Sequence, residues 1–214
     1  MIYLLSPVSK KETIHLPMIS FSLCEERLEL NDYDLLMFTS KQAVLSVEAL
    51  NPQWKNISCL AIGKATAKQI ESLGGTVAYC PESFYGETLS REIIEKFKNK
   101  NILYIRPKVI SFDSKGFLHK EGIEIDEKII YETSCVSYNE DQKPPKKSTI
   151  IFTSPSTIHC FLKSFEWDSS YIAVVIGEAT KAHLPKNAHY EVADSPLITS
   201  CIEKAKQILN PNKL

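Results

Sequence analysis

Short apolar runs rich in β-branched residues alternate along this chain with stretches of helical spacing. We expect strands at 2–5, 35–38, 57–62, 76–79, 102–105, 149–152, 171–176 and 190–192, and extended runs over 14–23 and 123–131. We expect helices at 41–50, 64–73, 87–98, 111–120, 156–164, 178–184 and 197–209. In the stretch 87–98, for example, Leu89, Ile93 and Phe97 fall on one helical face. Strands that alternate with helices in this order predict an α/β fold built on parallel sheets.

The sequence contains two copies of one pattern. Phe38-Thr39-Ser40 returns as Phe152-Thr153-Ser154, and Ile62-Gly63-Lys64-Ala65-Thr66 returns as Ile176-Gly177-Glu178-Ala179-Thr180. Both motifs recur at the same offset of 114 residues, from 38 to 152 and from 63 to 177. The repeat predicts two similar, flavodoxin-like lobes with parallel sheets and a deep cleft between them, where pockets prefer to form.

The copies differ in one place, and that place decides the predicted topology. The first copy continues into the strand 102–105, whereas the second copy ends with its last helix, and the amino-terminal run 2–5 has the form of the missing strand. We therefore predict a discontinuous first lobe made of residues 1–15 and 138–214, and a second lobe made of residues 26–123. Residues 16–25 and 124–137 are expected to cross between the lobes as two extended strands that pair in a short ladder.

Composition narrows the possible functions. The 25 basic and 26 acidic residues give a net charge of −1, which argues against a general nucleic-acid binder because such proteins carry a basic face. No run of about 18 apolar residues is present, which argues against a membrane span. The apolar run within residues 1–20 is too short for a signal peptide, so we expect a cytoplasmic protein.

The six cysteines stand singly, with no CxxC pair, at positions Cys24, Cys59, Cys80, Cys135, Cys160 and Cys201. In a chain without a secretion signal, this pattern predicts reduced and mostly buried thiols. The five histidines do not join them at metal-ligand spacing, so we expect no metal site.

Hydroxyl side chains stand where a strand gives way to a helix, in both copies. Thr39 and Ser40 hold this position in the first copy, and Ser154 and Ser156 hold it in the second. Ser and Thr at such a junction commonly serve as helix N-caps. The same position also binds anions in α/β proteins, because free amides and the helix dipole point at it. Capping and the binding of a ligand with several acidic groups are therefore both open interpretations.

The next strand of each copy ends in a glycine that is followed three residues later by a threonine. The pairs are Gly63 with Thr66 and Gly177 with Thr180. The glycine permits close approach of a ligand to the backbone, and the threonine hydroxyl is expected near the free amides of the first helical turn. One such pair is weak evidence, but two pairs at matching spacing favour a binding role.

Two further residues are candidates because of where they fall. Tyr131 lies in the predicted crossing at the lobe junction, although an aromatic residue in an extended run usually serves packing. Arg106 follows the strand 102–105, where it could pair with a ligand carboxylate or remain a solvated surface charge. Tyr104 and Tyr138 have no comparable argument and are expected to be structural. The chain has no GxSxG, Walker or GxGxxG motif, so nothing favours a hydrolase, nucleotidase or dehydrogenase.

Taken in order, these motifs resemble those of uroporphyrinogen-III synthases. The segments concerned are Phe38-Thr39-Ser40 with Ala43-Val44, Ile62-Gly63 with Thr66-Ala67, Ile130-Tyr131-Glu132-Thr133, Phe152-Thr153-Ser154-Pro155-Ser156, and Ile176-Gly177 with Thr180. The resemblance implies a lyase that closes the linear tetrapyrrole hydroxymethylbilane into uroporphyrinogen III, with inversion of ring D and loss of water. It implies Tyr131 as the catalytic residue, the positions named above as substrate-binding residues, and no metal or organic cofactor. It further implies a monomer that contacts the preceding pathway enzyme transiently.

The chain departs from the family's usual pattern at Lys64-Ala65, at Glu178-Ala179 and at Pro107, where the family commonly has glycine. The main alternative is a non-catalytic two-lobed binding or sensor protein of the same fold. A two-lobed sugar or amino-acid receptor is a second alternative, but such receptors are normally exported. Tyr131 and the paired threonines favour the enzyme.

Overall fold

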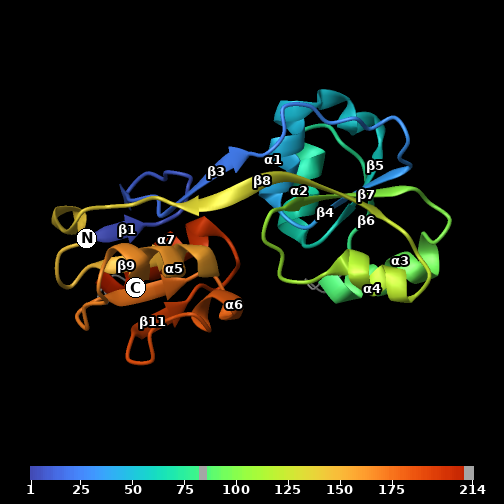
Figure 1. The fold of residues 1–214 in the computed structure, drawn as a ribbon. Coiled ribbons are helices and arrows are strands. Elements are labelled where there is room, and N and C mark those ends of the chain that lie inside the picture. The colour runs from blue at the N-terminus through green and yellow to red at the C-terminus, as the bar shows by residue number, and fades with distance from the viewer. Residues whose placement is uncertain (82–85, 210–214) are drawn as a thin grey trace. The chain divides into compact units, whose positions relative to one another are not determined.

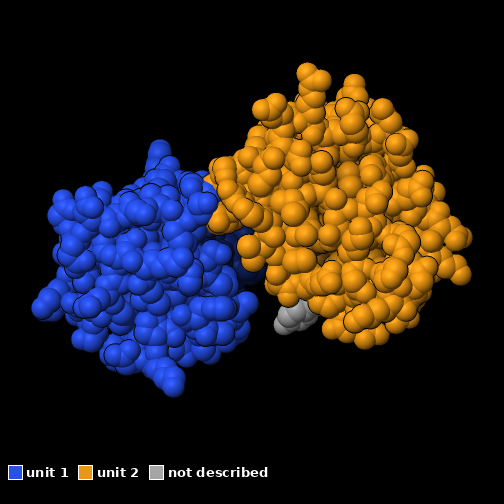
Figure 2. Space-filling view, viewed as in Figure 1, with its two compact units in different colours: residues 1–20, 134–214 blue, residues 21–133 orange. Residues whose placement is uncertain are grey.

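The computed structural model describes residues 1–81 and 86–209, and the chain divides into two compact units (Figure 1). Residues 1–20 and 134–214 form unit 1, and residues 21–133 form unit 2 (Figure 2). Unit 1 is discontinuous in sequence, because the chain leaves it after residue 20 and re-enters it at residue 134. Within the described ranges, no helix is both long and apolar enough to cross a membrane.

The sheet of unit 2 has six strands, and two of them, β3 and β8, continue across the unit boundary. Their order is β3 (Ile19–Leu23), β8 (Asp126–Cys135), β7 (Ile102–Pro107), β4 (Leu35–Phe38), β5 (Ser58–Ala61) and β6 (Val77–Tyr79). From β8 to β6 every neighbouring pair is parallel, as the sequence pattern predicted.

Helices cover both faces of this sheet, and each face has its own apolar cluster. The α1/α2 cluster contains residues of α1 (Lys41–Leu50), of the 3-10 helix η1 (Pro52–Asn56) and of α2 (Lys64–Ser72). The α3/α4 cluster contains residues of α3 (Gly86–Lys96) and α4 (Ser114–Lys120). Within β4, Leu36 and Phe38 belong to the first cluster, whereas Leu35 and Met37 belong to the second. A strand buried on both faces must be apolar throughout, which explains the continuous apolar runs in the sequence.

Unit 1 contains a five-stranded parallel sheet. Its strands follow the order β11 (His189–Val192), β10 (Ile172–Val175), β9 (Thr149–Phe152), β1 (Ile2–Leu4) and β2 (Ile14–His15). Its helices are α5 (Pro155–Ser164), α6 (Glu178–Lys181), α7 (Ile198–Leu209) and the 3-10 helix η2 (Glu140–Gln142). The amino-terminal strand β1 pairs in parallel with β9, so the prediction that it supplies the missing strand of the second copy is confirmed.

The strands β3 and β8 carry the chain from one unit to the other. Within unit 2, the Cys24 N–H donates to the Ile130 carbonyl at 3.0 Å. Within unit 1, the Val136 N–H donates to the Met18 carbonyl at 2.9 Å. The residue numbers of the partners run in opposite directions, so the two strands form an antiparallel ladder. Such a ladder pairs backbone groups of the two crossing segments with each other.

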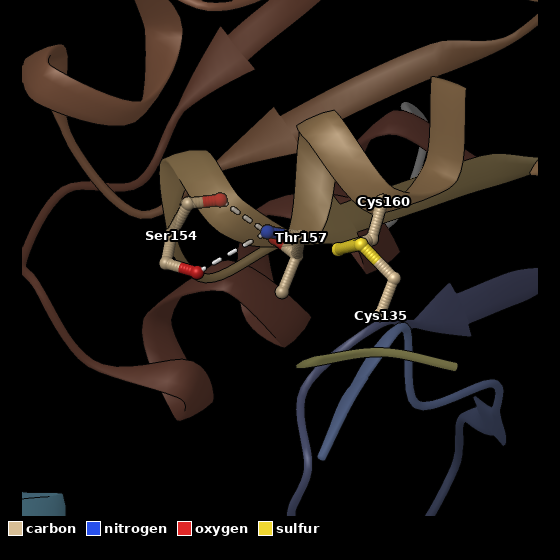
Figure 3. Close-up of a disulfide and its surroundings, with 4 residues drawn as sticks. All are labelled: Cys135, Ser154, Thr157 and Cys160. Atoms are coloured by element: carbon tan, nitrogen blue, oxygen red, sulfur yellow. Dashed lines mark hydrogen bonds between the residues drawn. A yellow bond between two sulfur atoms is a disulfide. The ribbon is translucent and has the colours of Figure 1, made fainter. Parts of the chain in front are cut away.

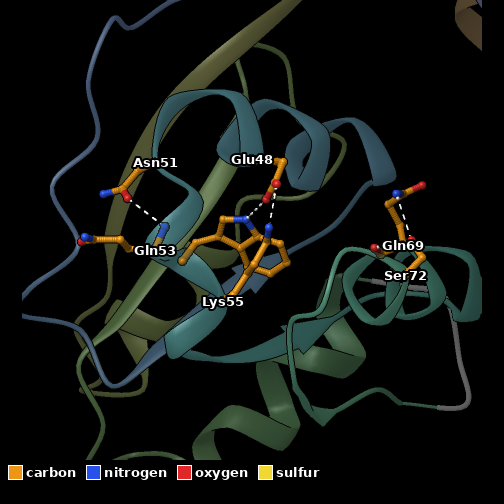
Figure 4. A network of polar contacts seen from close by, with 7 residues as sticks. Glu48, Asn51, Gln53, Lys55, Gln69 and Ser72 are labelled. Atoms are coloured by element: carbon orange, nitrogen blue, oxygen red, sulfur yellow. Dashed lines mark hydrogen bonds and ion pairs between the residues drawn. The ribbon is translucent and has the colours of Figure 1, made fainter.

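A buried tryptophan secures the end of α1 against the sheet of unit 2. The Trp54 indole N–H donates to a carboxylate oxygen of Glu48 at 2.7 Å. Lys55 Nζ donates to the other oxygen of Glu48 at 2.7 Å (Figure 4). The Trp54 ring meets Phe38 edge to face, with centroids 5.8 Å apart. Since Phe38 is the last residue of β4, this contact fixes α1 beside the strand from which it starts.

The expectation that all six cysteines are reduced is wrong for two of them. Cys135, at the end of β8, is disulfide-bonded to Cys160 of α5, and their Cα atoms lie 5.2 Å apart (Figure 3). The pair has no sequence signature, because its members belong to different elements that only the fold of unit 1 brings together. The other cysteines, Cys24, Cys59, Cys80 and Cys201, are free thiols. Burial raises the pKa of Cys59 to about 12 and that of Cys201 to about 11, so both thiols are expected to be unreactive.

We expect reduction of the disulfide, or Cys135→Ser, to lower the free energy of unfolding of unit 1 by about 3 kcal/mol, because it opens a cross-linked loop. The measurement is urea unfolding with and without a dithiol reductant, and Cys24→Ser, at an exposed free thiol, is the matched control. Alkylation of the denatured protein should modify four thiols before reduction and six after it. Six modified thiols without reduction would contradict the assignment.

Candidate functional site

The turn between β4 and α1 carries the first candidate residues of unit 2, Thr39 and Ser40. Ser40 is the N-cap of α1, and its Oγ accepts a hydrogen bond from the Ala43 N–H at 3.1 Å. The capping interpretation of Ser40 is therefore confirmed. Thr39 is half-buried beside it at the end of the strand.

Two tyrosine hydroxyls meet this turn. The Tyr131 hydroxyl lies 2.8 Å from Ser40 Oγ, and the Tyr104 hydroxyl lies 3.1 Å from Thr39 Oγ1. Tyr131 packs in the α1/α2 cluster, whereas Tyr104 packs in the α3/α4 cluster. The neighbouring side chains of Thr39 and Ser40 thus contact tyrosines on opposite faces of the sheet. The sequence analysis treated Tyr104 as structural. The one signal for its contact with Thr39 was that successive side chains of a strand point to opposite faces of the sheet.

A shift in strand register brings Tyr131 to Ser40. Along β7 and β8, Arg106 pairs with Ile129 but Pro107 pairs with Tyr131, so one extra residue, Ile130, lies on β8. Regular alternation would place Tyr131 on the same face as Ile129. Because of the extra residue, Ile130 and Tyr131 both join the α1/α2 cluster. This is the known effect of a β-bulge, which redirects a side chain.

The surroundings of Tyr131 keep its phenol protonated. Its side chain is 4% exposed, and its ring meets Phe21 edge to face. Burial raises the pKa of Tyr131, and the hydrogen bond with Ser40 partly opposes this rise. Tyr104 is similar, because burial raises its pKa while Thr39 and Arg106 act in the opposite direction. At neutral pH both hydroxyls therefore remain able to donate a hydrogen bond.

The second candidate turn of unit 2 leads into α2. Gly63 has φ of 80°, a backbone conformation that favours glycine, and no side chain caps the amino end of α2. Thr66 lies in the first helical turn with its side chain buried. Across the described parts of the chain, its hydroxyl has no hydrogen-bond partner. The helix thus begins with uncapped amides and an unused hydroxyl, which are groups that suit an anion.

In unit 1 the corresponding turns differ in detail. Ser154 is the N-cap of α5, where its Oγ accepts from the Thr157 N–H at 3.4 Å and its carbonyl accepts from Thr157 Oγ1 at 2.7 Å (Figure 3). Ser156 is exposed in the first turn of α5.

The turn into α6 resembles that into α2 in sequence but not in backbone conformation. Gly177 is extended, with φ of 175°, and a Cβ atom added there would meet no atom within 4 Å. Thr180 is buried, and its hydroxyl has no partner in residues 1–81 and 86–209. Glu178 forms an ion pair with Lys181 at 2.9 Å, which compensates its negative charge beside this turn.

Arg106 is engaged within unit 2. Its Nε lies 3.3 Å from Glu127 Oε2, and its side chain is only 14% exposed. The structure therefore does not bear out the interpretation of Arg106 as a solvated surface charge. The predicted contact with a ligand carboxylate stays a prediction. In the described part of the chain, no group of three or more His, Cys, Asp or Glu side chains could hold a metal ion.

These observations define the class of the protein. It is an α/β protein whose parallel strands end at the amino termini of helices, with a buried, protonated tyrosine bonded to one of these termini. The family described as uroporphyrinogen-III synthase HemD matches residues 10–203. The chain therefore belongs to the uroporphyrinogen-III synthase family.

Known proteins agree with this assignment. The porphyrin biosynthesis protein HemD of Ruminiclostridium josui is 29% identical over an alignment of 206 residues, and the match covers 88% of this chain. The chain spans about 40% of the length of that relative. The crystal structure of uroporphyrinogen-III synthetase from Helicobacter pylori 26695 matches with a TM-score of 0.78 and 26% identity, over 97% of this chain and 98% of that one. A mutant uroporphyrinogen III synthase from Thermus thermophilus matches with a TM-score of 0.61 over 99% of each chain, and at 11% identity it supports the fold alone.

The two glycines provide a matched prediction. We expect Gly63→Ala to lower the free energy of unfolding of unit 2 by about 1–3 kcal/mol, because alanine is strained at positive φ. Gly177→Ala should leave unit 1 almost unchanged, because its backbone is extended and the Cβ atom has space. Trp54 in unit 2 and Trp167 in unit 1 are the two tryptophans of the chain, so Trp→Phe backgrounds allow urea unfolding of each unit to be followed by fluorescence. Equal losses in both variants would contradict this account.

Proposed function

We propose that this chain is a uroporphyrinogen-III synthase that closes hydroxymethylbilane, inverts ring D and releases water. The observation that carries the proposal is the family match over residues 10–203, which includes Tyr131 and the hydroxyl-bearing turn that it contacts. The matched family, the curated relative and the Helicobacter pylori structure are all described as uroporphyrinogen-III synthase or HemD, so they do not favour the non-catalytic alternative.

The substrate-binding groups in this proposal are helix amino termini. The substrate carries acetate and propionate arms on each pyrrole, and backbone amides at helix starts bind carboxylates without needing a high net charge. The proposed substrate-binding residues are Thr39, Ser40, Gly63 and Thr66 in unit 2, and Ser154, Ser156, Gly177 and Thr180 in unit 1. The hydroxyls of Thr66 and Thr180 support this role, because they have no hydrogen-bond partner within the described residues and both threonines lie in the first turn of their helices.

Tyr131 is the proposed catalytic residue. Ser40 Oγ already accepts from the Ala43 N–H, so its own proton can be donated to the Tyr131 oxygen. In that arrangement the phenol proton is free to be donated to the departing hydroxyl of the substrate. Loss of water leaves an azafulvene, which ring D attacks through the carbon that already bears the chain. The spiro intermediate then fragments and recloses in the inverted orientation. In this scheme, much of the rate enhancement comes from holding the two terminal pyrroles of the substrate close together.

Further proposals concern the setting of the reaction. We propose that the chain acts as a cytoplasmic monomer without a metal or organic cofactor. We also propose that it meets the preceding pathway enzyme transiently, which suits a substrate that cyclises spontaneously when left in solution.

The activity test uses freshly prepared hydroxymethylbilane and chromatographic separation of the uroporphyrinogen isomers. We expect the III isomer with the protein, and the I isomer alone in a reaction without protein. Formation of the I isomer alone in both reactions would remove the proposed function.

For Tyr131→Phe we expect kcat to fall by about 10²-fold, because the variant keeps the ring packing and loses only the proton donor. Tyr138→Phe is the matched control, since it removes a hydroxyl that donates to the Pro17 carbonyl in unit 1. Because the pKa of Tyr131 is raised, ionisation of its phenol should not reduce kcat until the pH exceeds about 10. Unchanged turnover in Tyr131→Phe would remove its catalytic role.

A further inference from the structure

Arg106 directs all of its described contacts toward its own unit. The Nε lies 3.3 Å from Glu127 Oε2, and Nη1 donates to the carbonyls of Pro107 at 3.0 Å and Lys108 at 3.4 Å. The Arg106 and Glu127 side chains are only 14% and 18% exposed. The guanidinium therefore joins the first part of β8 to the turn that ends β7.

The turn at residues 106–108 also contacts the backbone of Tyr131. The Lys108 N–H donates to the Tyr131 carbonyl at 2.9 Å, and Lys108 Nζ lies 2.8 Å from the carboxylate of Glu132. Pro107 is the ladder partner of Tyr131 after the register shift. The contacts of Arg106 thus bracket the bulge, with Glu127 before the extra residue and the turn 106–108 beside Tyr131.

We propose that Arg106 and Glu127 are positioning residues for Tyr131. Arg106 acts through its ion pair with Glu127 and its hydrogen bonds to the carbonyls of Pro107 and Lys108, which together we call the clamp, rather than as a ligand for a substrate carboxylate. The inference rests on the proposed function, because it assigns the pair to the catalytic tyrosine. Residues 106–108, Glu127, Tyr131 and Ser40 all belong to unit 2, so the clamp is complete within one compact unit.

The physical reason is the sensitivity of a bulged ladder to slippage. A shift of one residue along a strand moves a side chain to the opposite face of the sheet. For Tyr131, that shift would remove the hydroxyl from Ser40 Oγ. Backbone bonds alone hold a bulge weakly, because the extra residue is left out of the regular pairing. A planar guanidinium that forms an ion pair with a carboxylate and donates hydrogen bonds to two carbonyls fixes the register more firmly than a single point charge.

The burial of the pair makes each partner dependent on the other. Within the described residues, Glu127 Oε1 and Arg106 Nε are both buried without a hydrogen-bond partner, so the two charges compensate each other through the ion pair alone. Removing one partner leaves a buried, uncompensated charge, whereas removing both leaves a neutral site. A double-mutant cycle therefore measures the coupling directly.

The kinetic test compares Arg106→Gln, Glu127→Gln and the double variant in the isomer assay. If the pair positions Tyr131, each single variant should lower kcat by about 10- to 100-fold with little change in KM, and the double variant should be no worse than either. Arg106→Lys should recover part of the loss, because it keeps the charge without the planar fork. If Arg106 instead binds the substrate, Arg106→Gln raises KM while Glu127→Gln leaves KM unchanged or lowers it. That result would overturn the proposal.

The second readout does not depend on activity. Hydrogen exchange of the Lys108 amide, which donates to the Tyr131 carbonyl, should become about tenfold faster in Arg106→Gln and in Glu127→Gln, measured on protein whose thermal unfolding shows that it is folded. Arg91→Gln is the control, because Arg91 forms an exposed ion pair with Glu87 in the same unit.

The exchange measurement separates two kinds of failure. If the wild-type protein makes no uroporphyrinogen III, the proposed function fails, and Lys108 exchange alone then decides whether the clamp exists. If the Lys108 amide exchanges at the wild-type rate in both folded variants, Arg106→Gln and Glu127→Gln, the proposed clamp is wrong whatever their activity.

Discussion

Burial of both faces of a parallel sheet is the constraint on which the rest of this structure depends. In unit 2 it requires apolar central strands such as β4 and helices on each side, and the parallel strands from β8 to β6 have their carboxyl ends at one edge. In β4 the first polar side chains then appear where the strand ends and α1 begins. Thr39, Ser40 and Gly63 stand at such junctions, so the packing of the core itself decides where chemistry is possible.

The sheet alone does not produce the contact between Tyr131 and Ser40. Regular alternation along β8 places Tyr131 on the wrong face, and the extra residue at Ile130 corrects this. A bulge costs ladder hydrogen bonds, and the Arg106–Glu127 pair and the Lys108 amide lie where they can offset that loss. In the proposed function, catalysis therefore depends on a local defect in an otherwise regular sheet.

The internal repeat shows that similar sequence need not mean similar detail. Gly63 and Gly177 occupy the same position in the two copies, but only Gly63 has a positive φ in the left-handed region. Ser40 and Ser154 both cap a helix, but only Ser40 also bonds a tyrosine among the described residues. The two copies thus share the strand–turn–helix pattern, but among the described residues only the N-cap of α1 is bonded to a tyrosine.

The sequence by itself determined the elements, because periodicity and capping are local properties. The strand 35–38 and the helix 41–50 were predicted at their observed bounds, and the resemblance carried by short motifs identified the family. The helix expected at 178–184 is shorter in the structure and ends at Lys181, and Pro185 disfavours helical backbone only at Leu184.

Only the tertiary structure decided the contacts between elements distant in sequence. The bond between Cys135 and Cys160, the ion pair of Arg106 with Glu127 and the hydroxyl pair of Thr39 with Tyr104 are of this kind. Each depends on strand register and helix packing, and a shift of one residue in either would separate the partners. Register is set by the whole sheet and its cores, and for that reason no short segment of the sequence could reveal it.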